Sequence, residues 1–260
     1  MKLKVLYKEL FEQLKKSSLK YNLPVILGKN ETDTSIFGDL SNLENILIGG
    51  TTGSGKSVFN HNIISTLLSL YTPDKLRLLL IDMKLVEFNQ YKDLPHLLSP
   101  VLPQKNDKGI NKIFSGFEWL LMEKNNRKNM TEEQLSKYPY IVVLIDTFSD
   151  LMASDSEKFE SYIMKITDRP SDVKIHTIIC DSRIGTDVFT SNILESFQTK
   201  IAFNTSDSRS SQLLLGIEGA EKLLGSGDML YLPKSADSPT RIQAPYISDK
   251  EISEIINSIK

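Results

Sequence analysis

One eight-residue stretch constrains this chain more than any other feature of its sequence. Residues 50–57 read GTTGSGKS and fit the pattern G-x-x-x-x-G-K-[ST]. The apolar residues 45–49 predict a strand before this stretch, and residues 56–70 predict a helix after it. A glycine-rich turn from a strand into a helix is the setting in which this pattern binds nucleotide phosphates.

The residue types explain how such a turn would bind phosphate. Glycines let successive backbone N–H groups point at phosphate oxygens, and the positive end of the helix dipole faces the same oxygens. We expect Lys56 to reach the β- and γ-phosphates of ATP and the Ser57 hydroxyl to ligate Mg²⁺. The predicted nucleotide-binding residues are Gly50, Thr51, Thr52, Gly53, Ser54, Gly55, Lys56, Ser57 and Val58.

A site of this kind also needs an acidic residue that closes a second apolar strand and orients Mg²⁺ through water. Two stretches fit: residues 141–146, IVVLID, end in Asp146, and residues 76–82, LRLLLID, end in Asp82. We favour Asp146, because many such ATPases carry next to this aspartate a second carboxylate that polarises the attacking water. Here that next residue is Thr147, which cannot act as a general base at neutral pH.

The remainder of the chain alternates between strand-like and helical stretches. Short strands are predicted within 24–42, and longer ones at 76–82, 140–146, 173–181, 199–204, 228–232 and 240–244. Helices are predicted at 1–20, 113–126, 156–168, 207–224 with a break near Gly216, and 249–259. This alternation predicts an α/β fold whose central sheet is mostly parallel and covered by helices on both faces.

We expect two parts in the chain. Residues 1–42 form a lead-in of one helix and short strands, and residues 43–260 form the main α/β domain. The lead-in helix carries leucines near one face, namely Leu3, Leu6, Leu10, Leu14 and Leu19. Residues 100–109 are the most loop-like stretch of the main domain.

Composition limits the setting in which the protein works. The 260 residues carry a formal net charge of −2, so any contact with nucleic acid must come from local basic groups. The single cysteine, Cys180, allows no internal disulfide, which indicates a reducing compartment. No stretch has the roughly 18 to 20 apolar residues of a membrane span. We therefore expect a cytoplasmic chain, with any membrane anchor on a missing segment or partner.

Several stretches resemble the FtsK/SpoIIIE family of DNA-translocating ATPases. They are GTTGSGKSV at 50–58, LLLIDMKLVEF at 78–88, LPHLL at 94–98, PYIVVLIDTFSDLM at 139–152 and GAEKLLGSGDMLY at 219–231. The resemblance spans about residues 23–247. It implies a RecA-like fold, ATP with Mg²⁺, a homo-hexameric or mixed ring, and movement of double-stranded DNA in chromosome segregation and cell division.

Three departures from the family pattern affect catalysis. Thr147 stands where the family has its catalytic glutamate. Ser182 replaces the glutamine that senses the γ-phosphate, whereas the following Arg183 is kept. The family arginine that reaches a neighbouring subunit's nucleotide aligns with Gln212, and Arg209 is its candidate substitute. The resemblance thus implies Lys56, Asp146, Arg183 and Arg209 as the catalytic residues.

Two interpretations of these departures stay open. Loss of a transition-state arginine costs about 10³ to 10⁵ in rate, so one expectation is a subunit that binds ATP well and hydrolyses it slowly or not at all. The alternative is that a nearby carboxylate, Asp150 or Asp181, replaces the missing base. A weak subunit would serve a ring, or a conjugative or secretion transfer complex, instead of a translocase.

Two further features carry expectations. Lys124, Arg127 and Lys128 form a basic helical end, which either complements the helix dipole or contacts DNA or another subunit. No winged-helix domain follows residue 260 and no membrane segment precedes residue 1, which suggests a motor module alone or a fragment.

Overall fold

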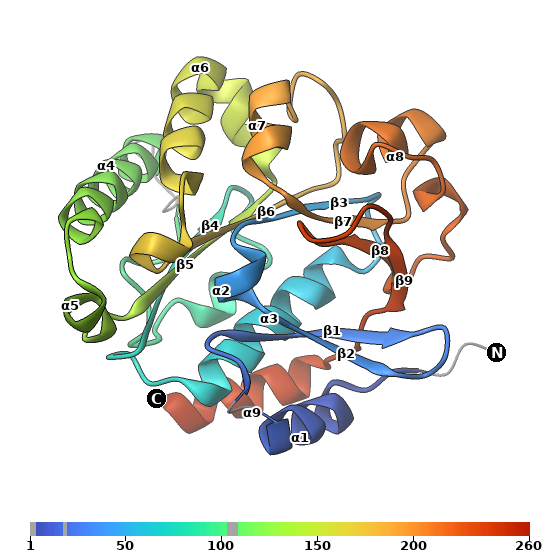
Figure 1. The fold of residues 1–260 in the computed structure, drawn as a ribbon, viewed down its shortest axis with the longest axis horizontal. Coiled ribbons are helices and arrows are strands. Elements are labelled where there is room, and N and C mark those ends of the chain that lie inside the picture. The colour runs from blue at the N-terminus through green and yellow to red at the C-terminus, as the bar shows by residue number, and fades with distance from the viewer. Residues whose placement is uncertain (1–3, 18–19, 103–108) are drawn as a thin grey trace.

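A computed structural model describes residues 4–17, 20–102 and 109–260. In this part of the chain nine strands form one sheet in the order β2-β1-β9-β8-β7-β3-β6-β5-β4. Figure 1 shows the sheet running through the middle of the molecule. The strands are β1 Pro24–Asn30, β2 Ser35–Asp39, β3 Ile46–Gly49, β4 Leu76–Asp82, β5 Tyr140–Asp146, β6 Ile175–Asp181, β7 Thr199–Phe203, β8 Asp228–Leu232 and β9 Thr240–Gln243.

The sheet has a parallel half and an antiparallel half. Strands β7, β3, β6, β5 and β4 are parallel, as the alternating pattern predicted. Strands β8, β9, β1 and β2 extend the sheet with antiparallel pairs. The connections from β8 to β9 and from β1 to β2 are too short for the crossover that a parallel pair requires. The sheet is therefore mixed, and the lead-in strands belong to it.

Helices cover both faces of the sheet, as predicted (Figure 1). One face carries α1, α3 and α9, and the other carries α4, α6, α7 and α8. The helices are α1 Tyr7–Ser17, α2 Leu40–Leu43, α3 Lys56–Leu70, α4 Gly109–Lys128, α5 Glu132–Ser136, α6 Phe148–Thr167, α7 Ser191–Ser196, α8 Ser208–Leu215 and α9 Asp249–Ile259.

Strand β5 shows why the sheet is buried on both faces. Its side chains alternate, so Val142 and Leu144 join the core under α3, whereas Ile141, Val143 and Ile145 join the core under α4 and α6. All five are almost completely buried. A continuous apolar strand of this kind must lie between two layers of helices. Its position places Asp146, the polar residue that ends the strand, at the edge of the sheet.

The structure corrects several predicted boundaries. Helix α6 begins at Phe148, eight residues before the predicted start, and bends at Asp155 (φ −164°, ψ 83°). The bend and the polar run around it interrupt the helical period. Within the predicted helix 207–224, the expected break near Gly216 is confirmed, because α8 ends at Leu215 and Gly216 adopts a left-handed conformation with φ 79°; after it only a short 3-10 helix, Ala220–Lys222, follows. Helix α7 was not predicted; its six residues are too few for a clear period.

The lead-in helix is shorter than predicted. Helix α1 buries Tyr7, Leu10 and Leu14, whereas Leu6 precedes it and is 46% exposed. Leu3 and Leu19 lie outside the described residues, as does most of the predicted loop 100–109.

The basic end of α4 is tied to the protein interior. Arg127 is buried, and its guanidinium donates to the carbonyls of Pro139 and Val173 at 2.8 and 3.1 Å and to Glu123 Oε1 at 2.7 Å. Lys124 Nζ donates to carbonyls at the end of α6, including that of Ile166 at 3.3 Å. Lys124 and Arg127 therefore fasten α4 to α6 and to the strands, which leaves them unavailable for contact with DNA or another subunit. Arg127 and Lys128 lie in the last turn of α4, as the helix-dipole interpretation expects.

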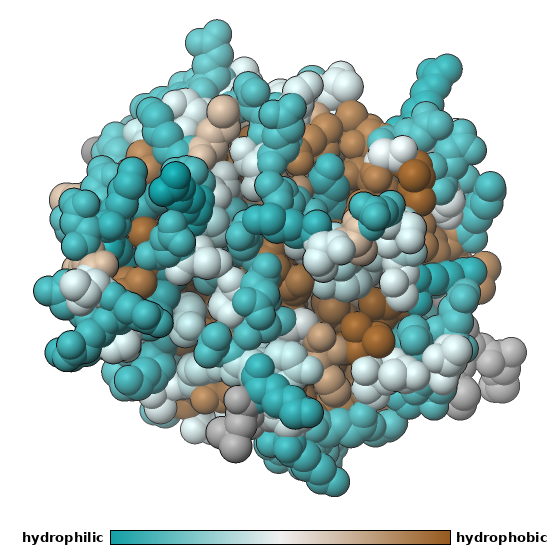
Figure 2. All heavy atoms as spheres, viewed as in Figure 1, coloured by the Kyte–Doolittle hydropathy of each residue, from teal (hydrophilic) through white to brown (hydrophobic). Residues whose placement is uncertain are grey.

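The molecular surface is mostly hydrophilic on the face drawn in Figure 2, with hydrophobic areas between the polar side chains. Exposed large hydrophobic residues include Val86 and Leu224, which are 72% and 71% exposed. No helix in the described part of the chain is long and apolar enough to cross a membrane.

Candidate functional site

The predicted phosphate loop lies at the centre of the parallel half of the sheet. It leaves the carboxyl end of β3, which pairs with β6 on one side and β7 on the other, and it leads directly into α3. The carboxyl ends of central parallel strands are where open α/β sheets bind ligands. The predicted strand and helix around the loop are both confirmed.

Two loop positions accept only glycine. Gly50 and Gly55 have φ values of 155° and 118°, which side chains rarely adopt. A Cβ atom would lie 2.7 Å from Phe203 Cβ at Gly50 and 2.6 Å from the backbone nitrogen of Gly227 at Gly55. The loop conformation therefore depends both on the glycines and on the neighbouring strand β7 and the residue that precedes β8.

The loop is also held by hydrogen bonds to neighbouring segments. The Thr51 N–H donates to the Asn204 carbonyl at 2.7 Å, and the Gly227 N–H donates to the Ser54 carbonyl at 2.9 Å. Lys56 Nζ donates to the Thr51 carbonyl at 3.0 Å. These bonds fix the backbone before any ligand binds, so the loop is preorganised for an anion.

A cavity of about 290 Å³ opens over the loop. Its lining includes six of the nine predicted nucleotide-binding residues, together with Asp146. Gly50, Thr51 and Ser54 shape the loop behind it. The lining residues are Thr52, Gly53, Gly55, Lys56, Ser57, Val58, Lys84, Val86, Glu87, Asp146, Thr147, Asp181 and Ser182.

The geometry separates the two candidate acidic residues. Asp82 is fully buried, and its carboxylate accepts the N–H groups of Lys84, Glu87 and Phe88 at 2.8 to 3.1 Å, so it shapes the loop after β4. Asp146 ends the next strand and lines the cavity. The choice of Asp146 as the residue facing a ligand agrees with this placement.

Glu87 is a site residue that the sequence reasoning missed. Its Oε1 accepts the Ser57 hydroxyl at 3.0 Å, and its Oε2 lies 3.5 Å from His61 Nε2. His61 Nδ1 is in turn 2.9 Å from the Tyr91 hydroxyl. The bonds to His61 and Ser57 hold the pKa of Glu87 below its usual value. One feature of the sequence could have identified Glu87. It is a carboxylate in the loop after β4, and the carboxyl end of β4 adjoins that of β5, which carries Asp146.

The carboxylates around Ser57 are arranged for a cation. Burial, and then the neighbouring charges of Asp82 and Glu87, raise the pKa of Asp146 to about 6. Such crowding of like charges is relieved by a positive ion. No group of three or more His, Cys, Asp or Glu side chains among the described residues is arranged to hold a metal alone. The residues thus fit Mg²⁺ that is bound partly through nucleotide phosphates, as Mg²⁺ usually is.

Two of the three positions that depart from the family pattern, Thr147 and Ser182, line the same cavity, whereas Gln212 does not. Thr147 has φ 58° and its hydroxyl donates to Asp146 Oδ2 at 3.3 Å. Ser182 also lines the cavity. Asp181 lines it too, but its oxygens accept the N–H groups of Ser149 and Arg183. Asp150, the other candidate replacement base, is not among the lining residues.

The two predicted catalytic arginines lie outside the cavity. Arg183 is 60% exposed and forms an ion pair with Asp187. Arg209 is exposed on α8. Neither guanidinium is among the groups that line the site within this chain.

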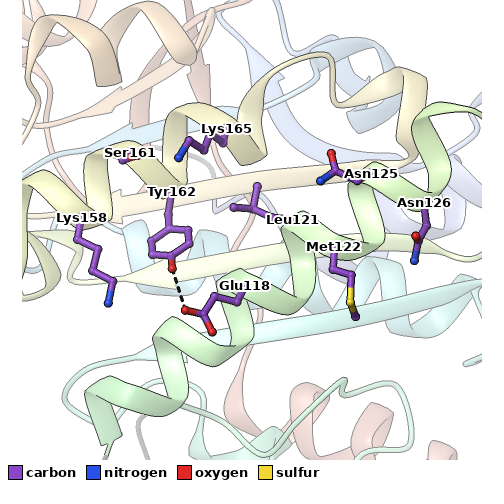
Figure 3. A pocket seen from close by; sticks show the side chains of 9 residues that line it. All are labelled: Glu118, Leu121, Met122, Asn125, Asn126, Lys158, Ser161, Tyr162 and Lys165. Carbon is purple, nitrogen blue, oxygen red and sulfur yellow. Dashed lines mark hydrogen bonds between the residues drawn. The ribbon is translucent and has the colours of Figure 1, made fainter.

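A larger hollow lies elsewhere, between α4 and α6. Figure 3 shows Tyr162 and Lys158 from α6 opposite Glu118 from α4, and the Tyr162 hydroxyl donates to Glu118 at 3.1 Å. Its volume is about 620 Å³, and it shares no residue with the phosphate loop. Size alone therefore does not mark the functional site; the smaller cavity contains the chemically significant groups.

A preorganised glycine loop between a central parallel strand and a helix, with an acidic residue ending a nearby strand, defines a P-loop NTPase. A sequence model of the FtsK/SpoIIIE family matches residues 8–134. The chain is 35% identical over 98% of its length to the DNA translocase FtsK of Staphylococcus epidermidis, and 36% identical over 98% to that of Treponema pallidum. It is 32% identical over 97% to the DNA translocase SpoIIIE of Bacillus subtilis. The chain thus contains an FtsK/SpoIIIE family domain and is similar to translocases of that family over nearly its whole length.

The chain spans about a third of these translocases, 34% of each. Two solved structures share its fold. The pCW3 conjugation coupling protein TcpA, in its monomer form with ATPγS, aligns with a TM-score of 0.77 at 22% identity, over 92% of this chain and 71% of that one. EssC (ATPases 2 and 3) from Geobacillus thermodenitrificans aligns with a TM-score of 0.75 at 19% identity, over 92% of this chain and 49% of that one.

Proposed function

We propose that this chain binds ATP with Mg²⁺ and acts as a motor that moves double-stranded DNA in chromosome segregation and cell division. The observation that carries the proposal is one cavity in which Lys56, Ser57 and Asp146 meet at a preorganised phosphate loop. The family domain and the similarity to DNA translocases support the choice of ATP and of DNA. In this proposal residues 43–260 form the motor, residues 1–42 form its lead-in, and the chain works in the cytoplasm.

Each residue has a chemical role in this proposal. The loop N–H groups and Lys56 bind the β- and γ-phosphates, and Ser57 and Asp146 orient Mg²⁺, which when bound would neutralise charge that develops on the phosphates. Glu87 accepts a hydrogen bond from the Ser57 hydroxyl, so that a lone pair of the hydroxyl oxygen is left for the cation. Arg183 and Arg209 act across a subunit boundary in a homo-hexameric or mixed ring, because both are exposed outside the cavity.

A second candidate function rests on the residues that would activate the attacking water. Thr147 occupies the position of the general base, and of the other carboxylates that line the cavity, Glu87 is bonded to Ser57 and Asp181 to two backbone N–H groups. The alternative is therefore a subunit that binds ATP and hydrolyses it weakly, in a ring or in a conjugative or secretion transfer complex.

Steady-state hydrolysis and nucleotide affinity, each measured with and without long double-stranded DNA, separate these functions. Turnover of about 1 per second or more that rises with DNA and falls with salt supports the translocase. Tight ATP binding with negligible turnover supports the weak subunit. The Lys56→Ala variant should lose most of its ATP affinity, and unchanged affinity would refute the phosphate-loop assignment.

A further inference from the structure

Lys84 is a second cation at the phosphate cavity, besides Lys56. Among the described residues that line this cavity, no other side chain is positively charged. Lys56 belongs to the phosphate loop, whereas Lys84 belongs to the loop that follows β4. Lys56 binds phosphate in the proposed function, and the charge of Lys84 still needs an explanation.

Asp82 holds the backbone on which Lys84 stands. Its buried carboxylate accepts the Lys84 N–H at 3.1 Å and the Glu87 N–H at 2.8 Å. The Leu85 N–H donates to the Asp82 carbonyl at 3.0 Å. Leu85 has φ 52°, a left-handed conformation that is uncommon for such a residue and persists only where its surroundings determine it. The loop therefore presents the Lys84 side chain from a fixed position.

This loop lies where the terminal phosphate is expected. Asp82 is the register partner of Asp146 across β4 and β5. The same loop carries Glu87, which accepts the Ser57 hydroxyl at 3.0 Å. Ser57 and Asp146 orient Mg²⁺ in the proposed function, and Mg²⁺ bridges the β- and γ-phosphates in enzymes of this class. Lys84 thus stands near the γ-phosphate end of a bound nucleotide.

The Lys84 ammonium is available to a ligand. The side chain is exposed and, within the described part of the chain, forms no ion pair with a carboxylate. An ammonium has three donors and no acceptor, and the charged oxygens of a phosphate are strong acceptors. Neither Arg183 nor Arg209 lines the cavity, so these arginines do not supply this charge within one chain.

We propose that Lys84 binds the γ-phosphate of ATP and makes this chain prefer ATP over ADP. The proposal rests on the proposed binding of ATP at the phosphate loop and adds to it a residue that determines specificity. Because Lys84 and Lys56 belong to the same chain, the preference needs no neighbouring subunit. A monomer therefore already distinguishes the two nucleotides.

The test compares the affinities of the purified chain for ATPγS and ADP, both with Mg²⁺, by calorimetry. Lys84→Met removes the charge and should weaken ATPγS binding about 10- to 100-fold, as loss of one hydrogen bond to a charged group does. ADP affinity should stay unchanged, because ADP lacks the γ-phosphate. Lys84→Arg keeps the charge and should retain the preference. The matched control Lys92→Met changes an exposed lysine outside the cavity and should bind both nucleotides as the unmodified chain does.

Lysine acetylation measured by mass spectrometry provides an independent readout. ATPγS should protect Lys84 from acetylation and ADP should not, whereas Lys92 should react alike with either nucleotide. The proposal is overturned if Lys84→Met weakens ATPγS and ADP binding equally or changes neither, or if Lys84 reacts equally with ATPγS and with ADP bound. Loss of both nucleotides in Lys56→Ala, with the Lys84 result negative, would leave the phosphate-loop function standing without this role for Lys84. Failure of the unmodified chain to bind either nucleotide would refute both.

Discussion

Glu87→Gln tests the residue that only the structure brought to the site. The substitution keeps the size of the side chain and an oxygen that accepts the Ser57 hydroxyl, which is now 3.0 Å from Glu87 Oε1. It removes the negative charge beside Asp146. Groups that hold a metal ligand in place typically contribute 10- to 100-fold to metal affinity, so the variant should bind Mg²⁺–ATP about 10 to 100 times more weakly.

The effect should be specific to the cation. In a chelator without Mg²⁺, ATP affinity should stay the same or rise, because one like charge near the phosphates is gone. The pKa of Asp146, which Glu87 helps to raise to about 6, should fall in the variant. Calorimetric ATP titrations over a series of Mg²⁺ concentrations measure the first effect, and carboxyl titration by NMR measures the second.

Asp150→Asn is the matched control for this experiment. Asp150 lies one turn into α6, close in sequence to Asp146, but it is not among the lining residues. Its substitution should leave the Mg²⁺ dependence unchanged. If Glu87→Gln binds Mg²⁺–ATP like the unmodified chain, the contribution of the Glu87 charge to cation binding is refuted.

Three further predictions address catalysis and stability. Thr147→Glu should raise ATP turnover if the missing base is the main defect; no gain in a steady-state assay would indicate that Ser182 or the arginine positions limit the rate as well. Arg127→Met removes a buried cation and should lower the free energy of unfolding by about 3 to 5 kcal/mol. The matched variant Lys128→Met changes an exposed residue and should lower it by about 0.5 kcal/mol or less. Equal denaturation midpoints for the two variants would refute the stabilising role of the buried Arg127. Because the pKa of Asp146 is raised from 3.8 to about 6, its stability contribution is most favourable below pH 4 and is lost as the pH rises through 6. Metal-free Asp146→Asn should thus be more stable than the unmodified chain at pH 8 by about 3 kcal/mol, with the difference vanishing near pH 4 in thermal melts.

Local sequence patterns determined the α/β class and the phosphate loop. The spacing of glycines, Lys56 and Ser57 is a property of eight consecutive residues, so no tertiary information was needed to find it. Continuous apolar runs such as β5 likewise predicted buried parallel strands, because a strand covered on both faces needs apolar residues at every position. The start of α6 was missed because the helix bends at Asp155, within the polar run 154–158 that separates its first turns from the rest.

The tertiary structure alone decided which polar groups meet. Glu87 and Ser57 are 30 residues apart, and only the order of the parallel strands brings the loop after β4 beside the phosphate loop. The same order gives Asp82 a structural role and leaves Asp146 facing the cavity. The sequence left open whether Lys124 and Arg127 complement the helix dipole or contact DNA or another subunit, and only the packing of α4 shows them buried against backbone carbonyls.

One physical cause separates what could be predicted from the sequence and what only the fold showed. A phosphate loop is specified by backbone conformation, which residue types such as glycine encode over a few positions. The rest of a site is specified by which strand ends and loops adjoin, and this depends on strand order and burial across the whole chain. The sequence therefore determined where phosphate is expected to bind, and only the fold decided that Glu87 stands beside Ser57 and that Asp146 lines the cavity while Asp82 holds the loop after β4.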